Sequence, residues 1–211
     1  MARGAINGLY AVTPDVSDTR WLLDKVDQVL AGGARLVQYR NKAATGPLKS
    51  KQARALLLLC ARYGVPLIVN DSPELAAEIG ADGVHLGRDD AAVRAARTLL
   101  GDTAIVGASC YGDMDRARQM LEQGASYLAF GRFFASNTKS EAAPAAVSLL
   151  VRARAELDAP LVAIGGITAD NAGALVSAGA DAVAVSGSLF RANDTQAIAE
   201  RIASLFTAID T

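Results

Sequence analysis

Three side chains with hydrogen-bond donors stand at alternate positions in the stretch LVQYRNK, residues 36–42. The stretch begins with apolar residues, as a buried β-strand would, and side chains alternate between the two faces of a strand. If the chain stays extended, Gln38, Arg40 and Lys42 point in one direction. Such a group could be a solvated strand end. An amide, a guanidinium and an ammonium on one face nevertheless favour an anion-binding site.

Carboxylates follow the next two apolar stretches of the sequence. Asn70 and Asp71 come directly after LIV, and Asp89 and Asp90 come shortly after GVHLG. Each aspartate alone could simply begin the helix that follows it. Two carboxylates at neighbouring strand ends are also the hard oxygen ligands of a Mg²⁺ ion that keeps waters and substrate phosphates. The pattern therefore indicates a possible metal site.

Eight short apolar stretches carry these polar residues at their ends or in the loops that follow. Between the stretches, apolar residues recur near i, i+3 and i+4, which is the pattern of amphipathic helices. Such alternation indicates parallel strands joined by right-handed crossovers, and eight units favour a closed barrel. The sequence predicts an α/β fold, a single-domain (β/α)8 TIM barrel over residues 1–211. The predicted strands are 10–13, 35–40, 67–70, 83–86, 104–109, 127–131, 161–166 and 182–186.

A Gly-Ala pair precedes the second, fourth, sixth and eighth predicted strands. The pairs begin at Gly33, Gly80, Gly124 and Gly179, so they are 47, 44 and 55 residues apart. Glycine ends helices in the left-handed conformation, and a fixed period is typical of repeated units. The repeat therefore supports a barrel built from quarter units.

In a TIM barrel the active site lies at the carboxyl ends of the strands. Ser109 ends the fifth predicted strand, and the long loop RFFASNTKSEAAP follows the sixth. The cations at this mouth, together with a metal, carry enough charge to bind a pyrophosphate. This first anion site would combine the metal with Arg40, Lys42, Asn70 and Lys139.

The turns IGGIT and VSGS follow the seventh and eighth predicted strands. Gly165 and Gly166 let the backbone approach a ligand closely, and a helix that starts near Thr168 would direct free N–H groups at it. These turns could be ordinary helix caps, but the corresponding loops frequently bind phosphate in this fold. We therefore expect a second anion site here, neutral and rich in backbone donors, that suits a monophosphate.

The bulk properties limit the possible partners. The formal net charge is -1 and the pI is near 5.8, so no overall basic field favours binding to nucleic acid or to a membrane surface. No leader or membrane-spanning run is expected, which predicts a cytoplasmic protein.

Cys60 and Cys110 lack metal-type spacing and are expected to be reduced thiols. The only histidine, His85, is expected to be a hydrogen-bonded structural residue rather than a catalytic one.

Six segments in order, over nearly the whole chain, closely resemble the thiamine phosphate synthase family. They are VQYRNK, IVNDSPELAAEIGADGVHLGRDD, GASCY, YLAFGRFFASNTK, VAIGGITADNA and AVAVSGSLF. The resemblance implies the (β/α)8 fold and a Mg²⁺-dependent transferase of thiamine biosynthesis. Its two small-molecule substrates would be 4-amino-2-methyl-5-hydroxymethylpyrimidine diphosphate and 4-methyl-5-(2-phosphoethyl)thiazole, and its products thiamine phosphate and pyrophosphate.

The resemblance also implies roles for individual residues. Asp71 and Asp90 correspond to the Mg²⁺ ligands; they stand 19 positions apart, as in the family pattern, which disfavours Asp89. Ser109 corresponds to a contact on the pyrimidine side. The implied diphosphate contacts are Gln38, Arg40, Lys42, Asn70 and Lys139, of which Arg40, Lys42 and Lys139 would be catalytic. The implied contacts of the thiazole phosphate are Ser136, Thr138, Gly166, Val185 and Ser186.

The sequence departs from the family pattern in two loops. Ala135 and Ser136 stand where many members have Pro-Thr, so the hydroxyl is kept while the proline is lost. The lost proline is expected to loosen this loop. Gly187 stands where an alanine is more usual. The second departure alters the predicted monophosphate turn.

The implied reaction needs no protein nucleophile. Ionisation of the pyrimidine diphosphate leaves a cation that the aminopyrimidine stabilises, and the thiazole nitrogen then attacks it. Cations and Mg²⁺ would stabilise the leaving pyrophosphate.

Two other functions compete, a thiazole tautomerase and a noncatalytic sensor of thiamine intermediates. A tautomerase would not need the Arg, Lys and paired-Asp cluster, and a sensor would bind ligands without turnover. The presence of the full set of diphosphate contacts favours the synthase. The oligomeric state does not follow from the sequence.

The choice of Asp90 over Asp89 as a metal ligand is testable. Asp90→Asn should raise the Mg²⁺ concentration that gives half-maximal activity, because a neutral amide is a poorer ligand for a hard cation than a carboxylate. The matched variant Asp89→Asn should leave that concentration nearly unchanged. Steady-state rates over a Mg²⁺ series compare the two, and equal shifts would contradict the choice of Asp90.

Overall fold

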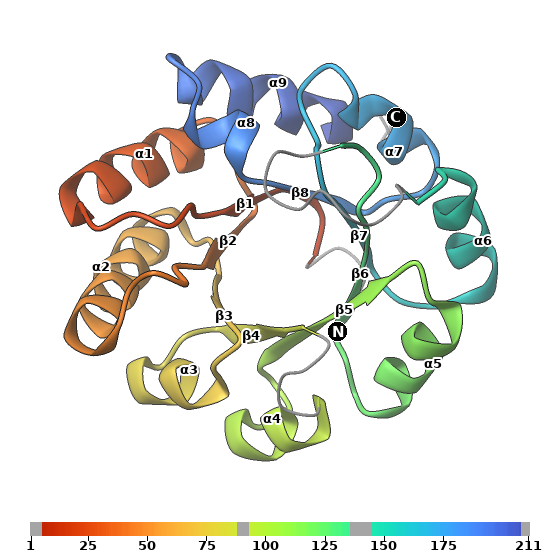
Figure 1. Ribbon diagram of the computed structural model, residues 1–211, viewed down its shortest axis with the longest axis horizontal. Helices are drawn as coiled ribbons and strands as arrows, with labels where there is room; N and C mark the ends of the chain where they lie inside the picture. Colours follow the sequence, from red (N-terminus) through yellow and green to blue (C-terminus); the bar gives the residue numbers. More distant parts are fainter. Residues whose placement is uncertain (1–5, 88–92, 136–144, 208–211) are drawn as a thin grey trace.

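The computed structural model describes residues 6–87, 93–135 and 145–207. Its eight strands form a closed barrel in the order β1 to β8, and every neighbouring pair is parallel. The helices surround this barrel in Figure 1. The predicted TIM barrel is therefore confirmed. The strands are β1 Gly8–Val12, β2 Leu36–Tyr39, β3 Leu67–Asn70, β4 Gly83–Leu86, β5 Ile105–Tyr111, β6 Tyr127–Gly131, β7 Leu161–Ile164 and β8 Ala182–Val185.

Helices follow each described strand, and the last strand is followed by two. Side chains cap several of the starts: Asp18 accepts from the Trp21 N–H at 3.0 Å, and Asp113 accepts from the Arg116 N–H at 3.0 Å. None of the described helices is long and apolar enough to cross a membrane. The helices are α1 Thr19–Ala31, α2 Gly46–Tyr63, α3 Pro73–Ile79, α4 Val93–Leu100, α5 Met114–Glu122, α6 Ser148–Glu156, α7 Ala172–Ser177, α8 Gly187–Phe190 and α9 Thr195–Thr207.

Alternation along the strands divides the core into two parts. In β1, Leu9 and Ala11 belong to the shell between strands and helices, whereas Tyr10 and Val12 belong to the cluster inside the barrel. This is the period of two expected of any strand. Here both faces are buried because the helices cover the outside. The strands consequently read as short apolar runs rather than as alternating sequences.

The four glycines of the Gly-Ala repeat have the conformation that the sequence indicates. Their φ angles are 91° at Gly33, 69° at Gly80, 95° at Gly124 and 101° at Gly179. Positive φ is costly for residues with a Cβ but not for glycine. Each glycine thus allows the chain to leave a helix and enter the next strand within a few residues.

Two local expectations need correction. β2 ends at Tyr39, so Arg40 and Lys42 follow the strand rather than continue it. The helix expected near Thr168 begins at Ala172, because Thr168 to Asn171 form a turn. The Asn171 Oδ1 atom accepts the Thr168 N–H at 2.8 Å. That N–H is therefore satisfied within the chain and is not directed at a ligand.

Gly107 in β5 provides the space in which the Tyr127 ring lies. A Cβ atom built on Gly107 would lie 2.0 Å from Cζ of Tyr127, far inside van der Waals contact. Gly107 and Tyr127 are paired across β5 and β6. The absence of a side chain at position 107 is what admits a large ring to the barrel interior.

Gly107→Ala should therefore destabilise the fold, because the added methyl group overlaps the buried ring and overpacking typically costs about 1–3 kcal/mol. The free energy of unfolding in urea measures the loss. Gly112→Ala is the matched control, since a Cβ there would lie 4.0 Å from Cδ2 of Leu149, which is ordinary van der Waals contact. A Gly107→Ala protein as stable as the control would show that the Tyr127 ring is not fixed as described.

Candidate active site

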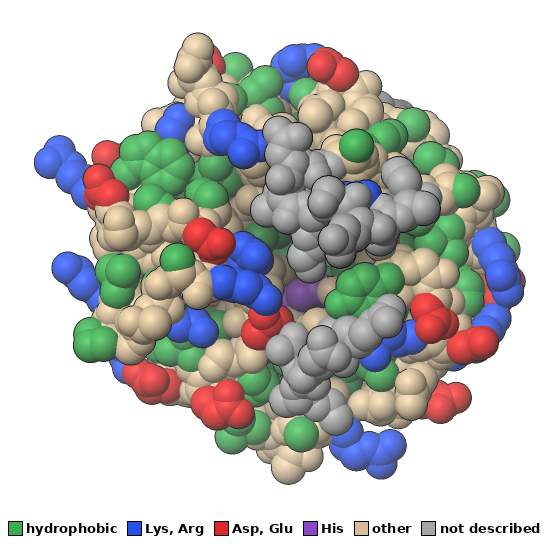
Figure 2. Space-filling model, in the orientation of Figure 1, with side chains coloured by type: hydrophobic (Ala, Val, Ile, Leu, Met, Phe, Trp, Pro, Cys, Tyr) green, Lys and Arg blue, Asp and Glu red, His purple; other side chains and the backbone are tan. Residues whose placement is uncertain are grey.

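The carboxyl ends of the strands converge on one face of the molecule. Figure 2 shows the single histidine near the middle of this view, with Lys or Arg side chains and an Asp or Glu side chain beside it. The histidine is His85 of β4, which is 7% exposed. The mouth of the barrel thus combines a nearly buried imidazole with charges of both signs.

The loop after β1 holds the residues that follow β2. The Thr13 hydroxyl accepts the Arg40 N–H at 2.8 Å and lies 2.9 Å from the Arg40 carbonyl oxygen. Asp15 Oδ1 accepts from Arg40 Nη1 at 3.2 Å and from the Lys42 N–H at 2.7 Å. Both the backbone and the guanidinium of this segment are therefore positioned. Thr13 and Asp15 were not among the predicted site residues, although the TPD sequence directly after a strand places them at the mouth.

Asp71 lies where β3 ends and faces the segment that follows β2. Its Oδ2 atom is 3.2 Å from Lys42 Nζ. Its φ angle is 61°, and non-glycine residues with positive φ are uncommon and often functional. Ser72, not Asp71, caps α3 by accepting the Leu75 N–H at 3.2 Å. The interpretation of Asp71 as a simple helix cap is therefore wrong.

Of the two aspartates predicted to bind the metal, only Asp71 lies within the residues that the structure describes. Asp71 is a hard oxygen donor at the mouth, and the approach of Lys42 shows that a cation is accommodated beside it. These features fit one ligand of a Mg²⁺ ion that takes its other oxygens from elsewhere. Asp90 and the rejected Asp89 lie outside the described residues, as do Ser136, Thr138 and Lys139. Among the described residues, no three His, Cys, Asp or Glu side chains cluster as metal ligands.

Five polar side chains form a continuous hydrogen-bonded chain across the barrel interior. Gln38 Nε2 donates to the Tyr10 hydroxyl at 2.9 Å, and that hydroxyl lies 2.8 Å from the Tyr127 hydroxyl. The Tyr127 hydroxyl lies 2.9 Å from His85 Nδ1, and His85 Nε2 lies 2.9 Å from Ser109 Oγ. We call these five residues the interior chain. It joins Gln38 to Ser109, two of the predicted site residues, through three residues that were not predicted.

Burial keeps the middle of the interior chain neutral. Desolvation raises the pKa of the Tyr10 and Tyr127 hydroxyls above their usual value. Burial lowers the pKa of His85 to about 4, against a smaller opposing effect of the Asp71 charge. The imidazole is thus uncharged near neutral pH. His85 is hydrogen-bonded and buried, as expected from the sequence.

The turns after β7 and β8 lie against each other. The Ser188 hydroxyl donates to the Ile167 carbonyl oxygen at 2.6 Å. Val185 ends β8 and Ser186 directly precedes α8. Gly166 lies in the turn after β7 with a φ angle of 66°. The described residues predicted to bind the monophosphate therefore belong to two joined turns.

A cation also lies at these turns, which corrects the expectation of a neutral site. A Cβ built on Gly187 would lie 2.5 Å from Nη2 of Arg191. The guanidinium therefore occupies space that the usual alanine side chain would fill. In the sequence, the glycine at position 187 in place of the usual alanine is the one indication of this arrangement. It does not by itself show that Arg191 fills the space.

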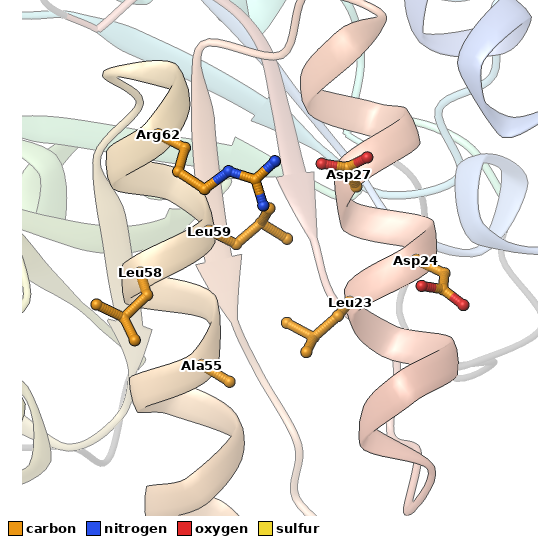
Figure 3. A pocket seen from close by; sticks show the side chains of 7 residues that line it. All are labelled: Leu23, Asp24, Asp27, Ala55, Leu58, Leu59 and Arg62. Carbon is orange, nitrogen blue, oxygen red and sulfur yellow. The ribbon is translucent and has the colours of Figure 1, made fainter.

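Figure 3 shows a recess between α1 and α2, on the ring of helices. No strand residue lines it, and its polar groups come from helices alone. It is separate from the strand ends, so it is not part of the candidate active site. The lining residues are Leu23, Asp24, Asp27, Ala55, Leu58, Leu59 and Arg62.

Comparisons with known proteins agree on one family. The thiamine monophosphate synthase family matches residues 9–189. The thiamine-phosphate synthase of Nitrosospira multiformis is 52% identical over 204 residues, which cover 97% of this chain and 87% of that protein. The thiamine-phosphate synthase of Methylobacillus flagellatus is 54% identical over 201 residues, which cover 95% of this chain and 96% of that protein.

Solved structures give the same fold. The thiamine phosphate pyrophosphorylase from Pyrococcus furiosus superposes with a TM-score of 0.85 at 28% identity, covering 98% of each chain. A 3-hexulose-6-phosphate synthase superposes with a TM-score of 0.67 at 19% identity, covering 95% of this chain and 99% of that one. The second likeness shows the fold alone.

The lowered pKa of His85 predicts a loss of stability in acid. Because the unfolded chain has a histidine pKa near 6.5, it binds a proton more readily than the folded protein does between pH 6.5 and about 4. The free energy of unfolding should therefore fall by up to roughly 3 kcal/mol from this group as the pH drops through that window. Urea unfolding at several pH values, with EDTA present, measures it. His85→Gln should show a flatter dependence, and identical slopes would contradict the prediction.

Proposed function

Because the chain belongs to the thiamine monophosphate synthase family, we propose that the mouth of its barrel binds a pyrimidine diphosphate and a thiazole phosphate side by side. Its activity is that of a thiamine-phosphate synthase, a transferase of thiamine biosynthesis. The assignment of the two substrates to different sides of the mouth is supported by one observation. Arg40, Lys42 and Asp71 converge at the ends of β2 and β3.

The diphosphate is assigned to the side of the mouth formed by β2 to β4. Arg40 supplies a planar donor that suits phosphate oxygens, and Lys42 supplies a second cation on a flexible stem. Asn70 ends β3 and is paired with His85 across β3 and β4. Lys139 would add a third cation. This side thus provides the positive charge that a pyrophosphate group requires.

Mg²⁺ is assigned to Asp71 together with Asp90. Bound there, the ion would neutralise charge on the diphosphate. Lys42 Nζ lies 3.2 Å from Asp71 Oδ2 and carries the charge that a diphosphate would also attract. Its ammonium can therefore pass from the carboxylate to a phosphate oxygen without leaving the mouth.

The thiazole phosphate is assigned to the joined turns after β7 and β8. Gly166 allows close approach of the backbone, and Val185 and Ser186 lie at the end of β8. Ser136 and Thr138 would contribute hydroxyl groups from the loop after β6. Arg191 adds a guanidinium to this side, which suits the charge of a monophosphate.

The assigned residues account for a dissociative substitution. The bond between the pyrimidine methylene carbon and the diphosphate oxygen breaks, leaving a carbocation that the aminopyrimidine stabilises. Arg40, Lys42 and Lys139 stabilise the charge that grows on the departing pyrophosphate. The thiazole nitrogen, held nearby by its own phosphate, then forms the new carbon–nitrogen bond. The reaction therefore needs no nucleophile or general base from the protein.

The cysteines are consistent with work in the cytoplasm, where we propose that the enzyme acts. Cys60 and Cys110 are both free and buried. Burial raises the pKa of each thiol to about 12, so neither is a reactive thiolate at neutral pH. We propose the two small molecules as its substrates, with neither nucleic acid nor a membrane as a partner.

Product analysis tests the proposed reaction. Purified protein with Mg²⁺ and both substrates should release thiamine phosphate and pyrophosphate in equal amounts, and EDTA should stop the reaction. A tautomerase would instead convert a thiazole phosphate isomer without the diphosphate. A sensor would bind the substrates and release nothing. Either result would overturn the proposed reaction.

Two arginine variants should separate the two substrates. Arg40→Ala should raise the KM for the pyrimidine diphosphate by about 10- to 100-fold, because a charge-assisted hydrogen bond contributes roughly 1.5–3 kcal/mol. The KM for the thiazole phosphate should change little. Arg191→Ala should do the reverse, by about two- to fivefold, since an exposed ion pair contributes less. Steady-state kinetics with each substrate varied in turn measures both. If both variants impaired the same substrate, the division of the mouth would be wrong.

A further inference from the structure

The interior chain has a direction, because each of its hydroxyl groups has only one hydrogen to donate. Gln38 Nε2 donates to the Tyr10 oxygen, so the Tyr10 hydrogen is left to bond Tyr127. In this direction the Tyr127 hydroxyl accepts that hydrogen and donates its own to His85 Nδ1, which lies 2.9 Å away. An imidazole that accepts at Nδ1 and is neutral carries its hydrogen on Nε2. Donation therefore runs from β2 through β1 and β6 to β4.

The last step determines the role of Ser109. In the same direction His85 Nε2–H donates to Ser109 Oγ, 2.9 Å away, and the serine oxygen is an acceptor within the chain. Its own hydrogen is then available to an acceptor in the mouth. Among the described residues, His85 is the side chain hydrogen-bonded to Ser109 Oγ. At the opposite end, Gln38 uses its amide nitrogen inside the barrel.

We propose that Tyr10, Tyr127 and His85 are positioning residues that orient the Ser109 hydroxyl as a hydrogen-bond donor to a ring nitrogen of the aminopyrimidine substrate. The inference rests on the proposed function, which assigns Ser109 and Gln38 to the pyrimidine side. It adds three residues that do not themselves take part in the bond-breaking step. It also assigns a single tautomer to the only histidine of the chain.

The chemistry of the substrate ring favours the same direction. If the Gln38 amide were reversed, every hydrogen bond would run the other way and Ser109 would donate its hydrogen to His85. Ser109 would then offer only an acceptor to the mouth. Ring nitrogens of a neutral aminopyrimidine are acceptors, so they need a donor from the protein. The proposed direction supplies that donor and also leaves Gln38 Oε1 as an acceptor for an amino group.

Packing holds the aromatic members of the interior chain in place. The Tyr10 and Tyr127 rings meet edge to face with centroids 5.9 Å apart, and the His85 ring stacks on Tyr127 at 5.6 Å. Tyr127 fills the space over Gly107. Tyr10 is 1% exposed and Tyr127 is fully buried. Reorienting one ring would leave a buried polar group without a partner, which is costly.

Nitrogen NMR of histidine-labelled protein tests the direction without any assay of activity. Because His85 is the only histidine, its two nitrogens give the only imidazole signals. At neutral pH we expect the correlation pattern of the Nε2–H tautomer. In Tyr127→Phe, which removes the donor to Nδ1, we expect this preference to weaken into a mixture of tautomers. A wild-type spectrum of the Nδ1–H tautomer, or an unchanged pattern in Tyr127→Phe, would overturn the proposal.

Kinetics of the same variant tests the positioning role. Tyr127→Phe keeps the ring over Gly107 but removes the hydroxyl, so the KM for the pyrimidine diphosphate should rise about tenfold while the KM for the thiazole phosphate stays unchanged. The matched control is Tyr39→Phe, since Tyr39 is also buried and its hydroxyl donates to Gln52 Oε1 at 2.9 Å outside the interior chain. The control should change neither KM.

Two kinetic outcomes would overturn the positioning role: equal effects of Tyr127→Phe and Tyr39→Phe, or equal changes in the two KM values of Tyr127→Phe. Failure of the proposed function has a different signature. In that case the wild-type protein would form no thiamine phosphate, whereas the tautomer of His85 would still be read directly from its spectrum.

Discussion

Polar groups inside a barrel of apolar residues must satisfy one another, and this constraint governs the centre of the molecule. Apolar side chains such as Leu36, Ile68 and Val162 fill the barrel interior. An unpaired hydroxyl or imidazole there would cost several kcal/mol. The interior chain meets this requirement with hydrogen bonds of 2.8–2.9 Å that connect five strands. The interior chain consequently provides polar groups beneath the mouth without a buried charge.

The charged groups lie at the mouth, outside the interior chain, and they occupy different sides of it. Arg40, Lys42 and Asp71 gather after β2 and β3, whereas Arg191 lies at the turns after β7 and β8. In the proposed division of the mouth, two anions bind on different sides while their organic rings share the middle. This arrangement suits a reaction in which one anion departs and the other holds the attacking group in place. In the proposed reaction, a neutral interior chain would leave the developing carbocation to be stabilised by the substrate itself.

The sequence predicts the fold well because the fold depends on local patterns. Short apolar runs and amphipathic helices locate all eight strands, and the Gly-Ala repeat marks four of the turns. It also places Asp71 at a strand end. It does not predict the start of α7, because Asn171 forms a turn with Thr168 that delays the helix.

The interior chain is harder to predict because it depends on closure of the barrel. Tyr10 and Tyr127 are 117 residues apart in sequence, and each is typical of an ordinary core aromatic in its own strand. Only the closed barrel brings their hydroxyl groups together and directs them toward His85. Arg191 is missed for a similar reason: its position over Gly187 depends on the path of a side chain rather than on a sequence period.

A crystal structure with the pyrimidine diphosphate and Mg²⁺, without the thiazole phosphate, tests the division of the mouth most directly. The account predicts the diphosphate beside Arg40 and Lys42, with Lys42 Nζ moved from Asp71 to a phosphate oxygen. It also predicts the pyrimidine ring over the interior chain, within hydrogen-bond distance of Ser109 Oγ. A diphosphate bound at the turns after β7 and β8, with the ion pair of Lys42 and Asp71 intact, would contradict it.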